Sequence, residues 1–175
     1  ISSPNSGIGY SPEDVKKGGN GYLPISLQYG EYKATEARAV SIAGGDPLEN
    51  FTNRSYKDKS NKAINHTDLG MVTDTYDKMK GKPVIVSITM DNPMVFHEFE
   101  SKANAILVNF RVQDQAILDI LTGKAEPSGL LPMQMPASMS VVEKQAEDAP
   151  HDMQCHKDAA GNVYTFGFGM NWKGL

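Results

Sequence analysis

Two apolar runs in the middle part of the chain constrain its fold most strongly. Residues 83–90, PVIVSITM, are rich in β-branched side chains, and residues 105–110, AILVNF, are apolar almost throughout. Continuous apolar runs of this length are typical of parallel strands that are buried on both faces. Helical patterns flank both runs, so the sequence predicts strands and helices in alternation.

The helical patterns differ in strength. Before the first run, apolar residues recur at helical spacing over residues 67–81, with Thr67 as the expected N-cap. Between the runs, residues 92–99 open with an Asn-Pro pair, which is a favourable cap and first turn for a short helix. After the second run, residues 116–121 predict another helix, and Gly123 is a natural stop.

A third strand is expected after the turn in residues 121–136, LTGKAEPSGLLPMQMP, and right-handed crossovers would lay the three strands parallel. Near the C-terminus, alternating apolar residues over 166–172 predict one more strand. The predicted fold is therefore α/β, a mostly parallel sheet flanked by helices in a three-layer αβα sandwich. Such sheets bind ligands at the carboxyl ends of their strands, here near residues 91–93 and 110–113.

The first part of the chain is less regular. Residues 1–21 hold glycines and prolines but few apolar side chains, which predicts a long loop. Residues 22–29 have a strand-like composition, although the proline within them would confine them to an edge or an irregular segment. Residues 33–45 favour one or two helical turns ending at Gly44, and residues 46–62 are expected to form an exposed polar excursion.

Composition and charge exclude several classes of function. The 175 residues suit one domain, expected to cover residues 1–175. The net charge of -4 gives no broad attraction to polyanions, so nucleic acid is not an expected partner. No apolar run approaches the roughly 20 residues that span a bilayer, so no membrane is expected either. The single cysteine, Cys155, indicates neither a reducing nor an oxidising compartment.

Four motifs share their order with a known family. The motifs are KPVIVSITMDNPM (82–94), ANAILVNF (103–110), ILTGKAEPSGLLPMQMP (120–136) and FGFGMNW (166–172). In this order they resemble the C-terminal domain of family 3 glycoside hydrolases, the β-glucosidase and β-xylosidase group. The resemblance covers residues 82–172 well and residues 1–81 weakly.

The resemblance implies most of one domain of a larger enzyme. In the family, a strand directly precedes the position of Ile1 and a (β/α)8 barrel precedes that strand, so the sandwich is expected to be incomplete at its N-terminal side. Leu131 stands where the family has Arg, and residues 46–62 look like an insertion. An empty place for the first strand would expose a sheet edge and favour a homo-oligomer.

The resemblance also implies a retaining exo-acting β-glycosidase, in which this domain forms one wall of the sugar cleft. The substrate would be a β-linked gluco- or xylo-oligosaccharide or an aryl glycoside, the barrel would be the partner domain, and no cofactor or metal is implied. The chain alone should be inactive, and a periplasmic or secreted location is favoured over the cytoplasm. Two alternatives remain: a non-catalytic carbohydrate-binding or interaction module, and a nucleotide-binding domain. The second is disfavoured because no strand leads into a glycine-rich turn that opens a helix.

The expected catalytic residues follow from the same resemblance. A retaining glycosidase needs two carboxyl groups about 5 to 5.5 Å apart, a nucleophile and an acid/base. The family's nucleophile is an Asp on the barrel, and many members supply the acid/base Glu from a loop of the pattern SEG.DR....LP. In SPEDVKKGGNGYLP, Glu13 matches this Glu at a spacing about one residue too long, Lys17 is near the Arg position, and Asp14 is the fallback. The alternative is that Glu13 is a solvated side chain on a flexible loop.

Other polar residues give weaker indications. The glycines of residues 18–21 could cradle a phosphate, with a flexible loop as the alternative. His151, Cys155 and His156 could ligate a soft metal, but their spacing is not that of a structural zinc site, so a surface loop is expected. His97 is expected on a helix face.

Aromatic residues and glycosylation sequons complete the candidates. Tyr10 and Trp172 could stack on a sugar ring, with core packing as the alternative for Trp172. Asn50, Asn53 and Asn65 begin Asn-X-Ser/Thr sequons, which mark exposed loop if the protein is secreted from a eukaryote.

Overall fold

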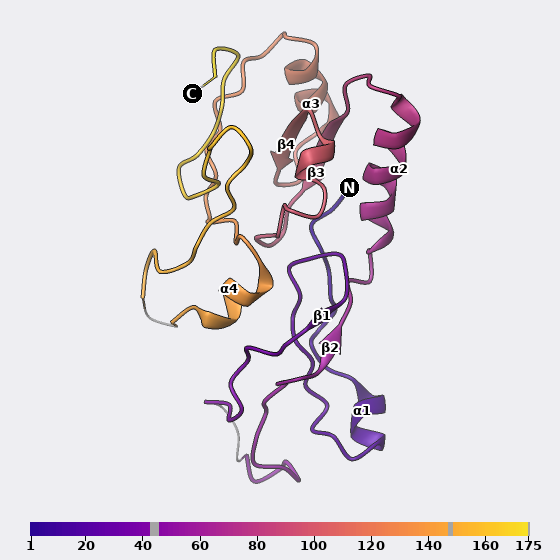
Figure 1. Cartoon of the computed structure of the whole chain (residues 1–175), viewed down its shortest axis with the longest axis vertical. Helices are drawn as coiled ribbons and strands as arrows, with labels where there is room; N and C mark the ends of the chain where they lie inside the picture. Colours follow the sequence, from indigo (N-terminus) through magenta and orange to yellow (C-terminus); the bar gives the residue numbers. More distant parts are fainter. Residues whose placement is uncertain (43–45, 147–148, 175) are drawn as a thin grey trace.

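The structure is a computed structural model that describes residues 1–42, 46–146 and 149–174. Its elements are α1 (Pro12–Lys16), β1 (Tyr32–Lys33), β2 (Ser60–Asn61), α2 (Thr67–Met79), β3 (Ile85–Thr89), the 3-10 helix η1 (Glu100–Lys102), β4 (Ala105–Asn109), α3 (Asp114–Leu121) and α4 (Met139–Lys144). Figure 1 shows an elongated molecule with β3, β4, α2 and α3 in its upper half and α1, β1 and β2 in its lower half. Among the described residues, no helix is long and apolar enough to cross a bilayer.

The parallel pair β3 and β4 confirms the central expectation and the α/β class. Its register runs from Ile85 opposite Ala105 to Thr89 opposite Asn109. In β3 the alternate residues are buried, whereas the middle of β4 is only half-buried. The prediction that the second strand is buried on both faces is therefore wrong. The three-layer arrangement is not confirmed, because the described residues place no third strand beside this pair.

The first three residues extend the sheet on the other side of β3. The amino group of Ile1 donates to the Ser87 carbonyl at 3.1 Å. The Thr89 amide donates to the Ile1 carbonyl at 3.0 Å, and the Ser3 amide donates to the Thr89 carbonyl at 2.9 Å. The bridge between Ser2 and Thr89 is parallel. The first three residues therefore run parallel to β3.

Residues 92–99 do not form the predicted helix. Met94, Val95 and Phe96 are consecutive and all buried, but Met94 and Phe96 join the core around β3, whereas Val95 joins a second core. The Val95 amide donates to the Leu27 carbonyl at 2.9 Å, so the backbone pairs with the first half of the chain. On a helix, Met94 and Phe96 would point to nearly opposite sides, whereas two alternate residues in one core with the residue between them in another is the pattern of extended backbone.

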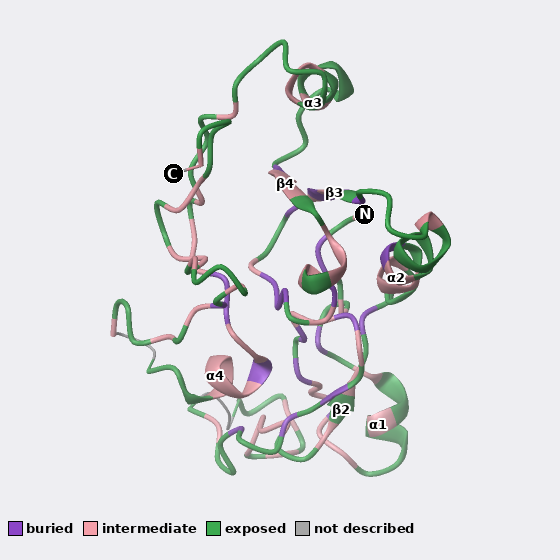
Figure 2. Cartoon of the chain, turned by 45° about the horizontal axis from the view of Figure 1, so that its top comes forward, coloured by how far each residue is buried: buried purple, intermediate pink, exposed green. Residues whose placement is uncertain are grey.

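Two hydrophobic cores hold the domain together. The larger contains Tyr29, Ala63, Val72, Val84, Val86, Ile88, Met90, Met94, Phe96, Phe99 and Met135. The smaller contains Tyr32, Ala34, Ala37, Val95 and Met139. Figure 2 shows these buried positions along the middle of the molecule, while α3 has no buried residue.

The two longest helices, α2 and α3, confirm the helices predicted from apolar residues at helical spacing, but their first and last residues differ from the prediction. In α2, Thr67 is the first helical residue instead of the N-cap, and the N-cap His66 makes no side-chain capping bond. The helix stops because Lys80 and Gly81 both take positive φ, 49° and 86°. The prediction of α3 is confirmed, with Gly123 in the left-handed region just after it.

The predicted third strand and the predicted C-terminal strand are both wrong within the described residues. The two segments instead pair with each other through irregular backbone. The Leu131 amide donates to the Phe168 carbonyl at 2.7 Å, and the Met135 amide donates to the Tyr164 carbonyl at 2.9 Å. Prolines in residues 130–136 remove donors that a regular ladder would need.

The first half of the chain is mostly irregular, as the glycines and prolines predict. Residues 22–29 form an irregular segment, and residues 33–42 hold no helical turn; Gly44 lies outside the described residues. The polar excursion of residues 46–62 is only partly exposed. Its last residues form β2, which pairs antiparallel with β1.

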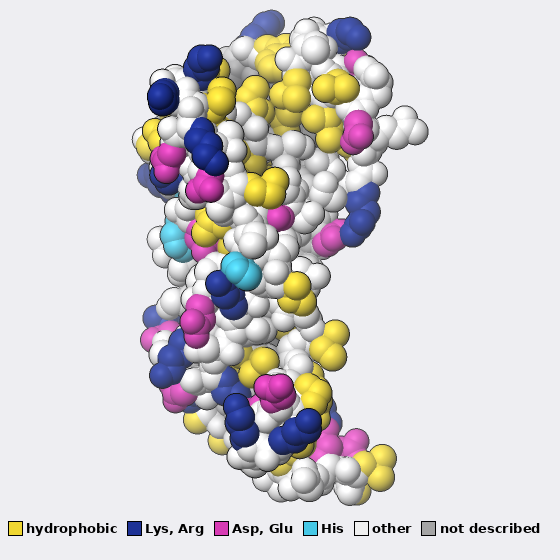
Figure 3. Space-filling model, turned by 90° about the vertical axis from the view of Figure 1, so that its right-hand side faces the viewer, with side chains coloured by type: hydrophobic (Ala, Val, Ile, Leu, Met, Phe, Trp, Pro, Cys, Tyr) yellow, Lys and Arg dark blue, Asp and Glu magenta, His cyan; other side chains and the backbone are white. Residues whose placement is uncertain are grey.

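Hydrophobic side chains remain exposed at the end of the molecule that carries α2 and α3. Figure 3 shows them gathered at the top of that view. Exposed hydrophobic residues of α2, β3 and α3 include Met71, Ile85, Leu118 and Leu121. Self-association through such an apolar surface stays a prediction.

Candidate functional site

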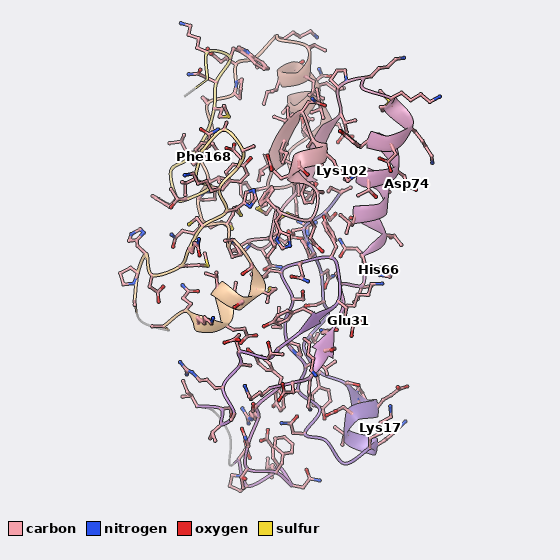
Figure 4. All side chains as sticks on the ribbon, in the orientation of Figure 1. Lys17, Glu31, His66, Asp74, Lys102 and Phe168 are labelled. Atoms are coloured by element: carbon pink, nitrogen blue, oxygen red, sulfur yellow. The ribbon has the colours of Figure 1, made fainter. Side chains whose placement is uncertain are left out.

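The loop around α1 carries the two predicted carboxylates. Ser11 is an extended N-cap whose Oγ accepts a hydrogen bond from the Asp14 amide at 3.2 Å, and Pro12 suits the first turn. Figure 4 shows Lys17, where α1 ends, at the lower end of the molecule, whereas Phe168 of the C-terminal segment lies in the upper half. The carboxylates thus lie far from the sheet.

Asp14 ties this loop to the segment before β2. Its Oδ2 accepts hydrogen bonds from the Gly21 amide at 2.8 Å and from Lys59 Nζ at 2.6 Å. Lys59 Nζ also donates to Asn20 Oδ1 at 2.6 Å. A Cβ at Gly19 would overlap the Asp14 carboxylate, so a larger residue there would displace that side chain. The hydrogen bond from Lys59 outweighs burial and lowers the pKa of Asp14.

We expect Asp14→Asn to lower the free energy of unfolding by about 1 to 2 kcal/mol at neutral pH, because it weakens a partly buried, charge-assisted contact. The folded-state pKa of Asp14 is depressed, so this stabilisation is present above the unfolded pKa of about 3.9 and is lost as pH falls through the folded value. Urea unfolding at neutral and acidic pH measures the difference. Asp74→Asn, at an exposed carboxylate on α2, is the control, and equal losses in both variants would contradict the assignment.

Glu13 lies on the exposed side of α1. Within the part of the chain that the structure describes, its side chain makes no hydrogen bond or ion pair. Its carboxylate is therefore open to a substrate or to another domain. Asp14, by contrast, is held in its ionised form, which opposes a role as proton donor. Of the two candidates, Glu13 is the better placed for acid/base chemistry, and its role stays a prediction.

The glycines of residues 18–21 do not form a phosphate cradle. The Gly18 amide donates to the Val15 carbonyl at 3.0 Å, and the Gly19 amide donates to the Asp14 carbonyl at 2.9 Å. The Gly21 amide is occupied by the Asp14 carboxylate. Because these amides already have partners and a carboxylate stands among them, an anion would meet repulsion there.

His151, Cys155 and His156 differ in how far they are buried. His156 is buried, with its ring centroid 6.0 Å from that of Phe96 and 5.0 Å from that of Tyr164. Burial lowers the pKa of His156. Cys155 is half-buried and His151 is exposed, and the described residues contain no cluster of three metal-ligating side chains. The surface-loop interpretation is therefore wrong for His156, which belongs to the core.

The remaining aromatic and histidine candidates lie at the surface. His97 is exposed and lies outside any helix. Trp172 is 56% exposed, so the core alternative is wrong for it. Tyr10 is 43% exposed and packs edge-on against Tyr22, with the ring centroids 5.8 Å apart. Stacking of Tyr10 or Trp172 on a sugar stays a prediction.

Two of the three sequon asparagines are engaged in the fold. Asn53 Nδ2 donates to the Ala39 carbonyl at 2.8 Å, and Asn65 Nδ2 donates to the Ser3 carbonyl at 3.1 Å. Asn50 is exposed. The other two are only partly exposed, and glycosylation of any of the three stays a prediction.

An ion pair occupies the carboxyl ends of β3 and β4. Arg111 binds Asp91 through two contacts, Nε to Oδ1 at 3.0 Å and a terminal nitrogen to Oδ2 at 2.6 Å. The buried Asn109 side chain donates to the Ile88 carbonyl at 3.0 Å. These polar side chains at the strand ends thus link β3 to β4.

Sequence reasoning missed Glu143, a half-buried carboxyl on α4. Burial raises the pKa of Glu143, and interactions with the hydroxyls of Tyr32 and Tyr56 oppose the rise. Burial raises the pKa of Tyr32, and the nearby charge of Glu143 adds to this rise. Among the described residues, the buried Tyr32 hydroxyl has no hydrogen-bond partner of standard geometry. The helical run around Glu143 gives no sequence signal for this environment.

The parallel pair of strands with its neighbouring helices is the arrangement of an α/β domain. Residues 26–172 match the model of the glycosyl hydrolase family 3 C-terminal domain, and the chain belongs to this family.

Curated relatives agree with this membership. Beta-glucosidase C of Emericella nidulans is 33% identical over 111 residues, which cover 63% of this chain and 16% of the relative. A periplasmic beta-glucosidase/beta-xylosidase of Dickeya chrysanthemi is 32% identical over 88 residues, which cover 50% of this chain and 12% of the relative. The chain therefore spans only a small part of the relatives that it matches. No solved structure matches significantly.

Proposed function

We propose that the chain is the C-terminal domain of a retaining, β-glucosidase-like exo-hydrolase and that it forms one wall of the sugar cleft. The family match over residues 26–172, together with relatives named as β-glucosidases, carries this proposal. The substrates would be β-linked gluco- or xylo-oligosaccharides or aryl glycosides. The name of the Dickeya chrysanthemi relative supports a periplasmic or secreted location.

In this proposal, Glu13 acts as the acid/base. It would protonate the leaving glycosidic oxygen and then accept a proton from the water that releases the sugar, while an Asp of another domain is the nucleophile. Docking of that domain over α1 would enclose the exposed Glu13 carboxyl beside the substrate. Asp14 and Lys59 would position the loop.

We also propose that a (β/α)8 barrel and a further strand precede this domain in a longer protein, with residues 1–175 as one domain. The parallel hydrogen bonds of Ile1 and Ser3 with β3 support the strand, because a chain arriving in that direction would continue along Ser87 and Ile85. The small fraction of each relative that is matched supports the additional domain.

The test compares this chain alone with the longer gene product. Hydrolysis of p-nitrophenyl β-glucoside and β-xyloside is expected only from the longer protein, because this chain would hold one half of the carboxylate pair. Hydrolysis by this chain alone would overturn the shared-site proposal. Inactivity of both, with retained sugar binding, would favour a non-catalytic carbohydrate-binding module instead.

A further inference from the structure

One asparagine in the loop after α1 lies among polar contacts that suit it for chemistry on its own backbone. Asn20 is followed by Gly21, whose φ is 83°. A glycine nitrogen is easily reached because no side chain shields it. An Asn-Gly pair is therefore the sequence in which the backbone nitrogen most readily attacks the preceding side-chain amide, and the product of that attack is a five-membered succinimide ring.

The side chain of Asn20 is folded back toward the Gly21 peptide. Its Oδ1 accepts a hydrogen bond from the Tyr22 amide at 3.1 Å, which forms an Asx turn. Its Nδ2 donates to the carbonyls of Asn53 and Ser55, both at 2.8 Å, and these bonds fix the orientation of the side-chain amide. The group that is attacked and the nitrogen that attacks are thus held together before the reaction.

Two charged groups contact the reacting atoms of this pair. Asp14 Oδ2 accepts the Gly21 amide hydrogen at 2.8 Å, so it lies where a general base would take the proton of the attacking nitrogen. Lys59 Nζ donates to Asn20 Oδ1 at 2.6 Å, where negative charge develops during the attack. Lys59 is also 2.6 Å from Asp14, and an ammonium in this ion pair has no lone pair with which to act as a competing nucleophile.

We propose that Asn20 is a self-modification site, at which the folded protein promotes conversion of the Asn-Gly pair to a succinimide and then to aspartate or isoaspartate. Asp14 takes the amide proton as the Gly21 nitrogen bonds to Asn20 Cγ, and Lys59 stabilises the oxyanion on Oδ1. The bond from Cγ to Nδ2 then breaks, Asp14 gives the proton to the leaving nitrogen, and ammonia departs. Water opens the ring at either carbonyl and is the one co-reactant.

The product changes how the loop is held. A carboxylate at position 20 has no N–H group for the carbonyls of Asn53 and Ser55, and its negative charge faces their oxygens. Isoaspartate also lengthens the backbone by one carbon. The reaction therefore loosens residues 17–21 from residues 53–55. The loop that carries Glu13 would change slowly and in one direction, whether or not Glu13 takes part in catalysis.

The test is the rate of this reaction in the intact protein at neutral pH, followed by mass spectrometry of the tryptic peptide of residues 18–33, in which Asn20 is the one asparagine. The peptide should gain the mass that converts an amide to a carboxyl, and isoaspartate should appear at position 20. The folded protein is expected to react about 10²-fold faster than the same protein unfolded in urea, because unfolding keeps the Asn-Gly pair but removes the base and the ammonium.

Two results of this comparison would overturn the proposal. The first is an equal or slower reaction in the folded protein, which would mean that the contacts shield Asn20. The second is a peptide of residues 18–33 joined covalently to the peptide that contains Lys59, which would mean that the lysine and not Gly21 attacks the amide.

Variants of the two charged residues assign their roles. Asp14→Asn removes the base, and Lys59→Met removes the ammonium at similar length. Each should slow the reaction of the folded protein about tenfold and leave the rate in urea unchanged. The matched controls, Asp74→Asn and Lys62→Met, lie at exposed positions and should react as the unmodified protein does. An unchanged or faster reaction in either Asp14→Asn or Lys59→Met would overturn the proposal.

A conservative variant separates chemistry from a loss of structure. Lys59→Arg keeps a cation that donates to Asn20 Oδ1 and should retain most of the rate. Circular dichroism under the same conditions shows which variants are folded, and only folded variants enter the comparison. Equal slowing by Lys59→Arg and Lys59→Met would remove the charge of Lys59 from the reaction and overturn its role.

Discussion

Glu13→Gln in the intact enzyme is expected to lower kcat/KM for a glycoside with a poor leaving group, such as cellobiose, about 10²- to 10⁴-fold. A poor leaving group needs its oxygen protonated as the bond breaks, and the amide cannot supply that proton. For p-nitrophenyl β-glucoside the loss in kcat/KM should be much smaller, because p-nitrophenolate leaves without protonation. The measurement is kcat/KM across aryl and alkyl glucosides whose leaving groups span a wide range of pKa.

Release of the covalently bound sugar gives a second readout for Glu13. This step needs the same carboxyl as a base, so azide, a nucleophile that needs no base, should restore turnover of the aryl glycoside in Glu13→Gln. The matched control is Glu31→Gln, at another exposed glutamate, which should behave as the unmodified enzyme does. A uniform loss across all leaving groups, or no loss, would remove Glu13 from the acid/base role. The same leaving-group pattern in Asp14→Asn would transfer the role to the fallback residue.

Sequence patterns predicted the parts of the fold that depend on local periodicity. The pair β3 and β4 follows from two apolar runs, and α2 and α3 follow from apolar residues at helical spacing. Local sequence preference gave the wrong prediction where tertiary contacts determine the backbone conformation. Residues 92–99 open with a favourable helix start, yet Met94 and Phe96 share one core while Val95 is buried in another, which is the alternation of extended backbone.

The candidate site shows the same division between local and long-range information. Glu13 could be found because its motif is contiguous in sequence. The contact of Asp14 with Lys59 could not, because the two residues are 45 positions apart and nothing in either segment marks the other. Glu143 interacts with Tyr32 and Tyr56 across most of the chain, so only the folded structure reveals its raised pKa.

Phe96→Ala is expected to lower the free energy of unfolding by about 3 to 5 kcal/mol, the largest stability effect that we predict. Phe96 is 1% exposed, and its ring lies 5.7 Å from that of Phe99 and 5.3 Å from that of Tyr164, centroid to centroid. Truncation would leave a cavity where the C-terminal segment packs on the core around β3. Urea unfolding measures the loss, and hydrogen exchange should show faster opening around Tyr164 and His156, which lose a ring partner.

Two further variants keep this prediction testable if Phe96→Ala is too unstable to fold. Phe96→Leu retains most of the side-chain volume and should lower the free energy of unfolding by about 1 to 2 kcal/mol. This variant therefore gives a measurable loss at position 96 even if Phe96→Ala does not fold. Phe110→Ala removes the same side chain at a position that is 47% exposed and should cost less than about 1 kcal/mol. Similar losses at Phe96 and Phe110 would mean that residues 92–99 do not anchor the core. A large loss confined to Phe96 would mean that residues 92–99 anchor the C-terminal segment to the core around β3.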